Sequence, residues 1–274
     1  MNELVIKGNR PPGVLDGLRE VWFFREVVWA FAERNVRLKY KQATLGVAWA
    51  IIQPLAFLGI FTVIFGRFAE LSKGNHSYAA YALSVLVPWI FLQTAVSIGA
   101  QMLVLDGTLV KKVYFAREAP ILGAVLATGL DFIIGLALVL IMNRYLGGRL
   151  AWTVLLAAPL WLLMAILAAG LAMTFGALTV YYRDFRYALP ILLQLWMFAS
   201  PVAYPLTAVP AKWRALYVLA NPAAGILDAF RRILVEGVAP DGGLLFTSTI
   251  ITLITAWVGY LIFKRMEPGF ADAI

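Results

Sequence analysis

The sequence contains no cysteine and only one histidine, His76, among its 274 residues. Without cysteine there can be no disulfide framework, thiol nucleophile or thiolate metal site. A single histidine also argues against a histidine metal cluster and against serine–histidine catalysis. The sequence has no G-x-x-x-x-G-K-[ST] loop either, so it cannot bind ATP by that route. We therefore expect no catalytic residues, metal site or cofactor on this chain.

Charge is also scarce. Charged residues make up 14% of the chain, hydrophobic residues make up 62%, and the mean hydropathy is +0.83. A soluble domain of this size does not need so much apolar surface. Six stretches are long and apolar enough to cross a bilayer, which takes about 20 residues per helix. The sequence therefore predicts an all-α integral membrane protein with six transmembrane helices within 45–274. The expected spans are 45–66, 78–104, 119–142, 154–181, 187–204 and 244–263.

The basic residues are divided unevenly between the two sides of these spans. Fifteen lie on the side that carries both termini, and eight lie on the opposite side. Since basic residues gather on the cytoplasmic side of a membrane, both termini are expected in the cytoplasm. The same rule explains the net charge of +8, so no nucleic-acid partner is expected.

Residues 1–44 are expected to form a cytoplasmic N-terminal segment, with no sign of a cleaved signal peptide. Within it, 20–41 has apolar residues at helical spacing. Trp22 and Trp29 lie one heptad apart and suit the headgroup region. We expect an amphipathic helix in the cytoplasmic interface. The alternative is a packed helix of a small cytosolic domain.

Two further segments are not simple loops. The cytoplasmic loop 106–118 is short, charged and expected to be helical; it is either a docking surface or a solvated connector. Residues 206–241 contain two short half-apolar helices, at 211–220 and 223–236, with Asp228 and Arg232 as an i,i+4 pair. Each helix is too short to span. We expect two re-entrant external helices between spans five and six that could act as a lid; the alternative is a hairpin on the headgroups.

Several short motifs occur in an order that resembles a known family. KYKQATLG (39–46) is followed by Trp49 and Gln53-Pro54, and YRDFR (182–186) is followed by Pro190, Ser200-Pro201 and Tyr204-Pro205. Asn221-Pro222 and Phe230-Arg231 come later. Together they resemble the ABC-2 type export permeases over nearly the whole chain. The resemblance is closest to the branch that exports polysaccharides and teichoic acids across the bacterial inner membrane, including O-antigen permeases.

This resemblance implies a permease subunit in the bacterial inner membrane that forms a homodimer and binds two copies of a separate ATPase. ATP and Mg would then belong to the partner. The cargo would be a polysaccharide, either free or linked to an undecaprenyl carrier; the alternative is an ABC-2 permease for a drug or lipid. The 20–41 helix and the 106–118 loop would be the docking surfaces. The loop's docking residues would be Leu109, Val110, Lys111, Lys112, Tyr114 and Arg117.

Aromatic residues make up 14% of the chain. Most would serve packing or lipid contacts, but some could line a channel, because sugar rings present apolar faces that stack on aromatic rings. Gln53, Gln93 and Gln194 could then meet sugar hydroxyls. The expected pathway residues are Trp49, Phe57, Phe61, Trp89, Phe91, Trp196, Phe198 and Tyr204.

Asp131 is the one acid expected near mid-membrane, and the sequence places no basic partner within a helix turn of it. It could be a proton or cation site, but a structural hydrogen bond to a neighbouring helix or a position beside a wet cavity is favoured. Small residues at four-residue spacing in 119–142 and 154–181 predict close helix contacts, which we also take to favour a dimer. A membrane-embedded transferase is disfavoured because the acids are scattered. A secondary transporter is disfavoured because intramembrane charge is rare.

Overall fold

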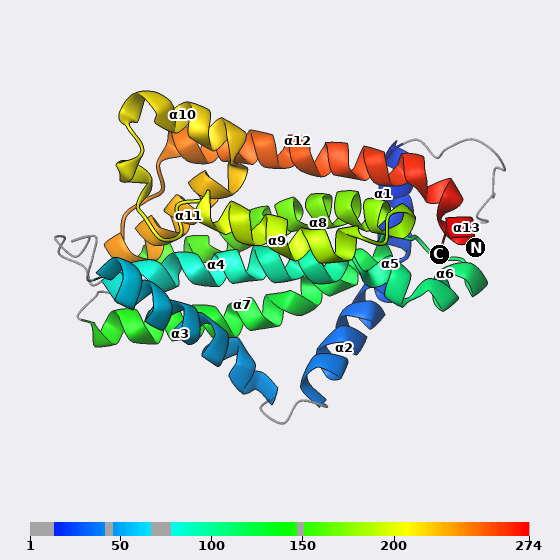
Figure 1. Ribbon diagram of the computed structural model, residues 1–274, viewed down its shortest axis with the longest axis horizontal. Coiled ribbons are helices and arrows are strands. Elements are labelled where there is room, and N and C mark those ends of the chain that lie inside the picture. The colour runs from blue at the N-terminus through cyan, green and yellow to red at the C-terminus, as the bar shows by residue number, and fades with distance from the viewer. Residues whose placement is uncertain (1–13, 42–45, 67–77, 147–150, 274) are drawn as a thin grey trace.

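The computed structural model describes residues 14–41, 46–66, 78–146 and 151–273, and all of its regular structure in these ranges is helical. Figure 1 shows an elongated bundle in which α4, α7, α8, α9 and α12 run along the long axis. The α-helices are α1 (Val14–Phe23), α2 (Arg25–Lys41), α3 (Trp49–Phe61), α4 (Tyr78–Gly99), α5 (Met102–Leu105), α6 (Gly107–Lys112), α7 (Ala119–Tyr145), α8 (Ala157–Tyr181), α9 (Phe185–Phe198), α10 (Ala211–Ala220), α11 (Pro222–Arg231), α12 (Gly242–Met266) and α13 (Phe270–Ala273). Single 3₁₀ turns are η1 (Gly46–Ala48), η3 (Trp152–Leu156), η4 (Leu206–Ala208) and η6 (Glu267–Gly269), and π turns are η2 (Thr62–Gly66) and η5 (Arg232–Glu236).

Five helical segments within the described residues are long and apolar enough to cross a membrane. They are Gly46–Ile64, Tyr78–Leu105, Ala119–Tyr145, Trp152–Tyr181 and Gly242–Gly269. They correspond to five of the six expected spans. The remaining span, expected at 187–204, is not confirmed, because α9 has only 14 residues. At 1.5 Å per residue α9 is about 21 Å long, shorter than the ~30 Å hydrocarbon core.

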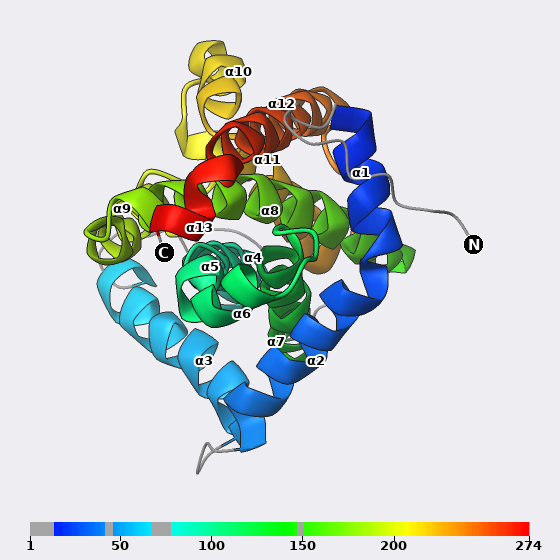
Figure 2. The same cartoon turned by 90° about the vertical axis from the view of Figure 1, so that its right-hand side faces the viewer.

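Helix α4 is the centre of the bundle. In an apolar 18-residue stretch of Tyr78–Leu105, which contains α4, 72% of the residues are buried. Leu83, Leu86 and Trp89 have no exposed surface. The end-on view in Figure 2 shows α3, α7 and α8 around it. Helix α3 instead lies at the edge of the bundle. In an apolar 18-residue stretch of Gly46–Ile64, which contains α3, only 17% of the residues are buried. Helices α2 and α3 form the two arms of a V that opens toward the bundle (Figure 1).

Glycine permits the close approach of α8 and α12. A Cβ atom at Gly170 would overlap Ala256 Cα, and one at Gly259 would overlap the Gly170 carbonyl oxygen. The small residues noted in the sequence act similarly inside the chain. A Cβ at Gly123 would lie 2.5 Å from Phe31 Cβ, and one at Gly99 would lie 2.9 Å from Ala172 Cβ. These small-residue faces join helices within one chain, so they do not themselves support a dimer.

The segment 206–241 is packed more deeply than the sequence suggests. Every residue of α11 from Pro222 to Phe230 is buried, and α11 contacts α4, α8 and α12. The expected Asp228–Arg232 pair is wrong. Asp228 Oδ1 lies 2.9 Å from Arg231 Nη2, whereas Arg232 Nε donates to the Ala239 carbonyl at 3.0 Å. The reason is that a π turn begins at Arg232 and departs from the i,i+4 geometry of an α-helix.

The N-terminal segment packs on the bundle in its described part. The expected single helix at 20–41 is broken at Phe24 into α1 and α2. On α2, Val28 and Phe31 are buried in a hydrophobic cluster with residues of α7, α8 and α12. Trp29 on α2 and Trp22 on α1 are instead 68% and 73% exposed. The helix is therefore amphipathic as expected; its place in the membrane interface stays a prediction.

Candidate functional site

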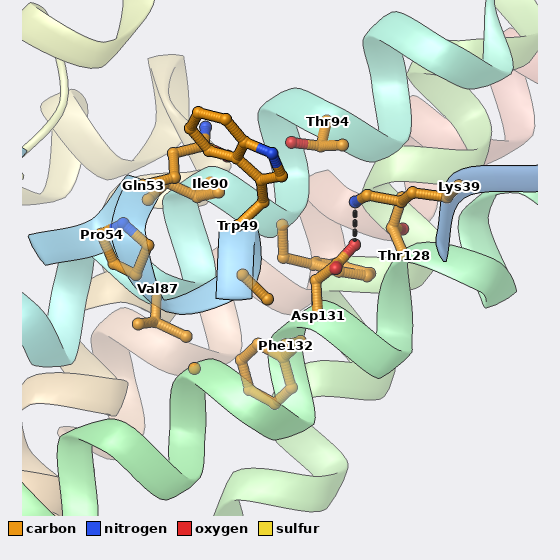
Figure 3. A pocket seen from close by; sticks show the side chains of 13 residues that line it. Lys39, Trp49, Gln53, Pro54, Val87, Ile90, Thr94, Thr128, Asp131 and Phe132 are labelled. Carbon is orange, nitrogen blue, oxygen red and sulfur yellow. Dashed lines mark hydrogen bonds and ion pairs between the residues drawn. The ribbon is translucent and has the colours of Figure 1, made fainter. Parts of the chain in front are cut away.

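A small cavity lies where α2 and α3 meet α4 and α7. Its volume is about 70 Å³, enough for a few water molecules. Figure 3 shows a mixed lining in which Trp49 and Phe132 stand beside the polar groups of Lys39 and Asp131. The lining residues are Lys39, Trp49, Ala50, Gln53, Pro54, Val87, Ile90, Phe91, Thr94, Thr128, Asp131, Phe132 and Gly135.

Asp131 has two donors at this cavity. Lys39 Nζ lies 2.5 Å from Asp131 Oδ2, and the Tyr40 hydroxyl donates to Oδ1. The Asp131 side chain is 14% exposed and that of Lys39 is 40% exposed. Burial and the neighbouring carboxylate raise the pKa of Tyr40 above its usual value, so its phenol keeps the proton that it donates. No basic residue lies within a helix turn of Asp131 in the sequence. Its partner, Lys39, belongs to another helix and is 92 residues away.

The contacts along α7 locate this ion pair within the span. A Cβ on Gly123 would touch Phe31 of α2, and eight residues farther along both helices Asp131 meets Lys39. Asp131 lies 12 residues from the first residue of α7, or about 18 Å along the helix axis. The end of α2 therefore reaches far along a membrane-length helix. A carboxylate at such a depth needs a partner, and α2 supplies it.

Two of the expected pathway residues line the cavity, namely Phe91 and the half-exposed Trp49. Most of the others belong to one hydrophobic cluster or pack against it. Within it, the Trp196 ring meets that of Trp89 edge to face at 5.5 Å, and Trp196 Nε1 donates to Asn221 Oδ1 at 3.1 Å. Tyr204 is partly buried with its hydroxyl 3.1 Å from that of Tyr217.

The burial of these aromatics also varies. Phe61, Trp89 and Phe91 are buried, Phe57 is partly buried, and Phe198 is half exposed. Their role in a substrate pathway stays a prediction. Thr94, Thr128 and Phe132 also line the cavity, but the sequence alone did not single them out. Thr128 could have been identified, because it is three residues from Asp131 on α7 and residues at this spacing share a helix face.

The expected docking loop lies at one end of the bundle, where α6 is close to α13 (Figure 1). Lys111 and Lys112 are exposed, Leu109 and Tyr114 also reach the surface, and Val110 is buried. Two contacts tie the loop to its neighbours. The Tyr114 hydroxyl donates to Glu20 at 2.9 Å, and Arg117 Nη1 donates to the Glu267 carbonyl at 2.6 Å. The docking role stays a prediction.

A charged cluster beneath this loop was not foreseen. Lys264 Nζ lies 2.7 Å from Glu118, 2.9 Å from Glu267 and 3.9 Å from Glu20. Glu118 has no exposed surface, and this burial raises its pKa despite the nearby ammonium. The cluster joins the loop, α1 and the end of α12. In the sequence, Lys264 looked only like a basic residue flanking a span.

The described residues contain no group of three His, Cys, Asp or Glu side chains placed to hold a metal ion. His76 and the stretch 42–45 of the KYKQATLG motif lie outside the described residues.

Known proteins are similar to this chain over most of its length. Residues 26–235 match the family model described as ABC-2 type transporter. The chain is 25% identical to the O-antigen export system permease protein RfbA of Myxococcus xanthus, covering 94% of this chain and 98% of that protein. It is 23% identical to the protein of the same name from Klebsiella pneumoniae, covering 91% and 95%. It is 26% identical to the polysialic acid transport protein KpsM of Escherichia coli, covering 86% and 92%.

Proposed function

This chain belongs to the ABC-2 type transporter family, and we propose that it is the permease subunit of an ATP-driven exporter that moves a polysaccharide across the bacterial inner membrane. The observation that carries the proposal is the nearly full-length match to O-antigen export permeases. The polysialic acid transport protein extends the similarity to a second kind of glycan. None of these three relatives is named for a drug or lipid cargo.

The cargo in this proposal is an O-antigen or related cell-surface glycan, with an undecaprenyl carrier attached in the lipid-linked form. A weakly charged polymer needs no counter-charge along its route. The exposed rings of Trp49 on α3 and Phe198 on α9 supply stacking faces, and Gln53 at the cavity supplies a polar group. Stacking on aromatic rings tolerates changes of sugar, so a long chain could slide past them.

The proposed assembly is a homodimer with two copies of a separate ATPase subunit, which carries ATP and Mg. The uncovered apolar surface of α3 and α9 supports it. Only 17% of the residues are buried in the apolar stretch that contains α3. On α9, the side chains of Tyr187, Ile191 and Leu195 are more than half exposed. A second copy would cover such faces. The ATPase would dock on Lys111, Lys112 and their neighbours, with both termini in the cytoplasm. The short helices α10 and α11 would re-enter the membrane from outside.

Deleting the chain from its host tests the proposed function. Surface polysaccharide should disappear, and polymer should accumulate inside the cells. Plasmid-borne wild-type chain should restore the surface polymer, provided that the ATPase subunit is present. Unchanged surface polysaccharide together with increased retention of a drug or lipid would refute the proposal.

The proposed orientation can be tested separately because the chain has no native cysteine. Lys111→Cys should be protected from a membrane-impermeant thiol reagent added outside, whereas Lys212→Cys should be labelled. The reverse pattern would place the termini outside the cytoplasm.

A further inference from the structure

An apolar groove of about 700 Å³ runs between the N-terminal helices and the bundle. Residues of α1 and α2 form one wall of the groove, and residues of α7 and α8 form its floor. Leu122 and Leu126 of α7 and Ile166 and Ala169 of α8 line the floor. All of these side chains are uncharged hydrocarbon on membrane-length helices, so the floor suits an acyl chain.

The floor residues of α7 and α8 lie beside one another toward one end of the bundle. That end holds the first residue of α7 and the last of α8, since Arg117 donates to the Glu267 carbonyl and Tyr181 donates to the Met266 carbonyl. The two helices are offset along the bundle, because a Cβ at Gly176 of α8 would meet the side chain of Ile121 of α7. The floor covers 122–126 of α7 and 165–169 of α8, or about 6 Å of helix length on each.

The wall of the groove carries one positive and one negative side chain in succession, Arg25 and Glu26. Both are exposed, and in the described part of the chain neither forms an ion pair. Arg25 makes only a 3.4 Å hydrogen bond to the Trp22 carbonyl and lies over the Trp22 ring at 5.6 Å. An adjacent cation and anion complement a headgroup that carries a phosphate and an ammonium.

The rim of the groove is aromatic. Trp22 and Trp29 line it while exposing 73% and 68% of their surfaces. Tryptophan favours the level of lipid headgroups, where its ring is half apolar and its N–H finds polar partners. The rim thus marks the level at which the charges of Arg25 and Glu26 would meet a headgroup.

We propose that this groove binds one zwitterionic phospholipid of the ethanolamine type. Its phosphate lies on Arg25, its ammonium lies on Glu26, and an acyl chain lies along Leu122, Leu126 and Ile166. Charge complementarity favours this occupant over an anionic lipid, which Glu26 would repel, and over a second copy of the chain, which would leave the two charges in an apolar contact. The lipid fills the space between α2 and α8 and so fixes the N-terminal helices on the bundle.

Native mass spectrometry of the detergent-purified full chain tests the proposal. The probes are a phosphatidylethanolamine and a phosphatidylglycerol with identical acyl chains. The wild type should retain one phosphatidylethanolamine and bind it about tenfold more tightly than phosphatidylglycerol. Arg25→Ala and Glu26→Gln should each weaken that binding about fivefold to tenfold. Ile166→Trp, which fills the floor with a larger apolar side chain, should block binding.

The matched controls are Arg37→Ala and Glu33→Gln, because these residues form an exposed ion pair on the same helix but do not line the groove. They should leave lipid binding unchanged. Equal binding by wild type, Arg25→Ala and Ile166→Trp would overturn the site. A preference for phosphatidylglycerol that Glu26→Gln does not alter would overturn the headgroup assignment. Disulfide-linked dimers of Trp29→Cys in membranes would overturn the lipid in favour of a second copy.

Discussion

Lys39 and Asp131 are 92 residues apart in the sequence, yet Lys39 Nζ lies 2.5 Å from Asp131 Oδ2. The pair joins the last turn of α2 to the middle of α7. It gives a structural reason for an acid at this depth, and it places a charged pair beside Trp49 at the edge of a cavity.

Asp131→Asn should lower stability without abolishing export. The change leaves the Lys39 ammonium without its counter-charge, which costs about 1–2 kcal/mol for a pair that is only partly buried. Lys39→Met combined with Asp131→Asn should recover most of the loss, because no unpaired charge remains. Thermal unfolding in detergent measures the loss of stability. Surface polysaccharide at equal membrane abundance measures export. Abolished export in a variant of normal stability would instead indicate a proton- or cation-coupled step.

The charged cluster at the end of α12 should respond asymmetrically to mutation. Lys264→Met leaves Glu118, Glu267 and Glu20 without the shared ammonium and should cost about 3–5 kcal/mol. Glu118→Gln should be nearly neutral, because Lys264 still pairs with Glu267 at 2.9 Å and a buried carboxylate is removed. Thermal unfolding of the two variants, purified in the same detergent, provides the comparison. Equal losses would contradict the arrangement.

The stability of Lys264→Met should also depend on pH. Burial already raises the pKa of Glu118, and loss of the ammonium should raise it further. A group whose folded-state pKa is raised contributes stability at low pH, and that stability is lost as pH rises through the folded-state pKa. The deficit of Lys264→Met relative to wild type should therefore shrink as the pH is lowered. In Lys264→Met with Glu118→Gln, this pH dependence should be reduced.

The contact between α8 and α12 should tolerate no side chain at Gly170. Gly170→Ala places a methyl group against the Ala256 backbone, and overpacking of this kind costs about 1–3 kcal/mol. Gly59→Ala is the matched control, because nothing lies within 4 Å of a Cβ atom at that position. It should be neutral or gain up to about 1 kcal/mol from helix propensity. Unfolding midpoints in one detergent compare the two, and equal stability of the variants would contradict the close packing.

Trp89→Ala should impair folding, whereas Trp49→Ala should impair export. Trp89 has no exposed surface, so its loss should cost about 3–5 kcal/mol and lower membrane abundance. Trp49 is half exposed at the cavity, so Trp49→Ala should fold normally and reduce export through a lost stacking face worth about 1 kcal/mol. Surface polysaccharide normalised to membrane abundance separates the two effects. Normal export by Trp49→Ala would remove this residue from the pathway.

Much of the helical framework could be predicted from composition, because long charge-free runs leave few alternatives in a bilayer. Pro201 signalled an early end of α9, because a helix usually ends at or before the residue that precedes a proline. The expected span nevertheless continued to 204, whereas α9 ends at Phe198. The sequence could not separate the buried Trp89 from the exposed Trp49, because in an apolar helix both sides look alike. The partner of Asp131 was hidden for a related reason, as helical spacing reports neighbours within one helix only.

The N-terminal helices have anchors at both ends. Glu20 of α1 contacts Tyr114 of the 106–118 loop, and Lys39 at the far end of α2 holds Asp131. A 17-residue helix such as α2 is a stiff rod about 25 Å long, so a tilt of about 5° at one end displaces the other by about 2 Å. If an ATPase pushes on the loop, the push would pass through α1 and the break at Phe24, and α2 would then act as a lever arm. The stroke would arrive beside the cavity in the middle of the span.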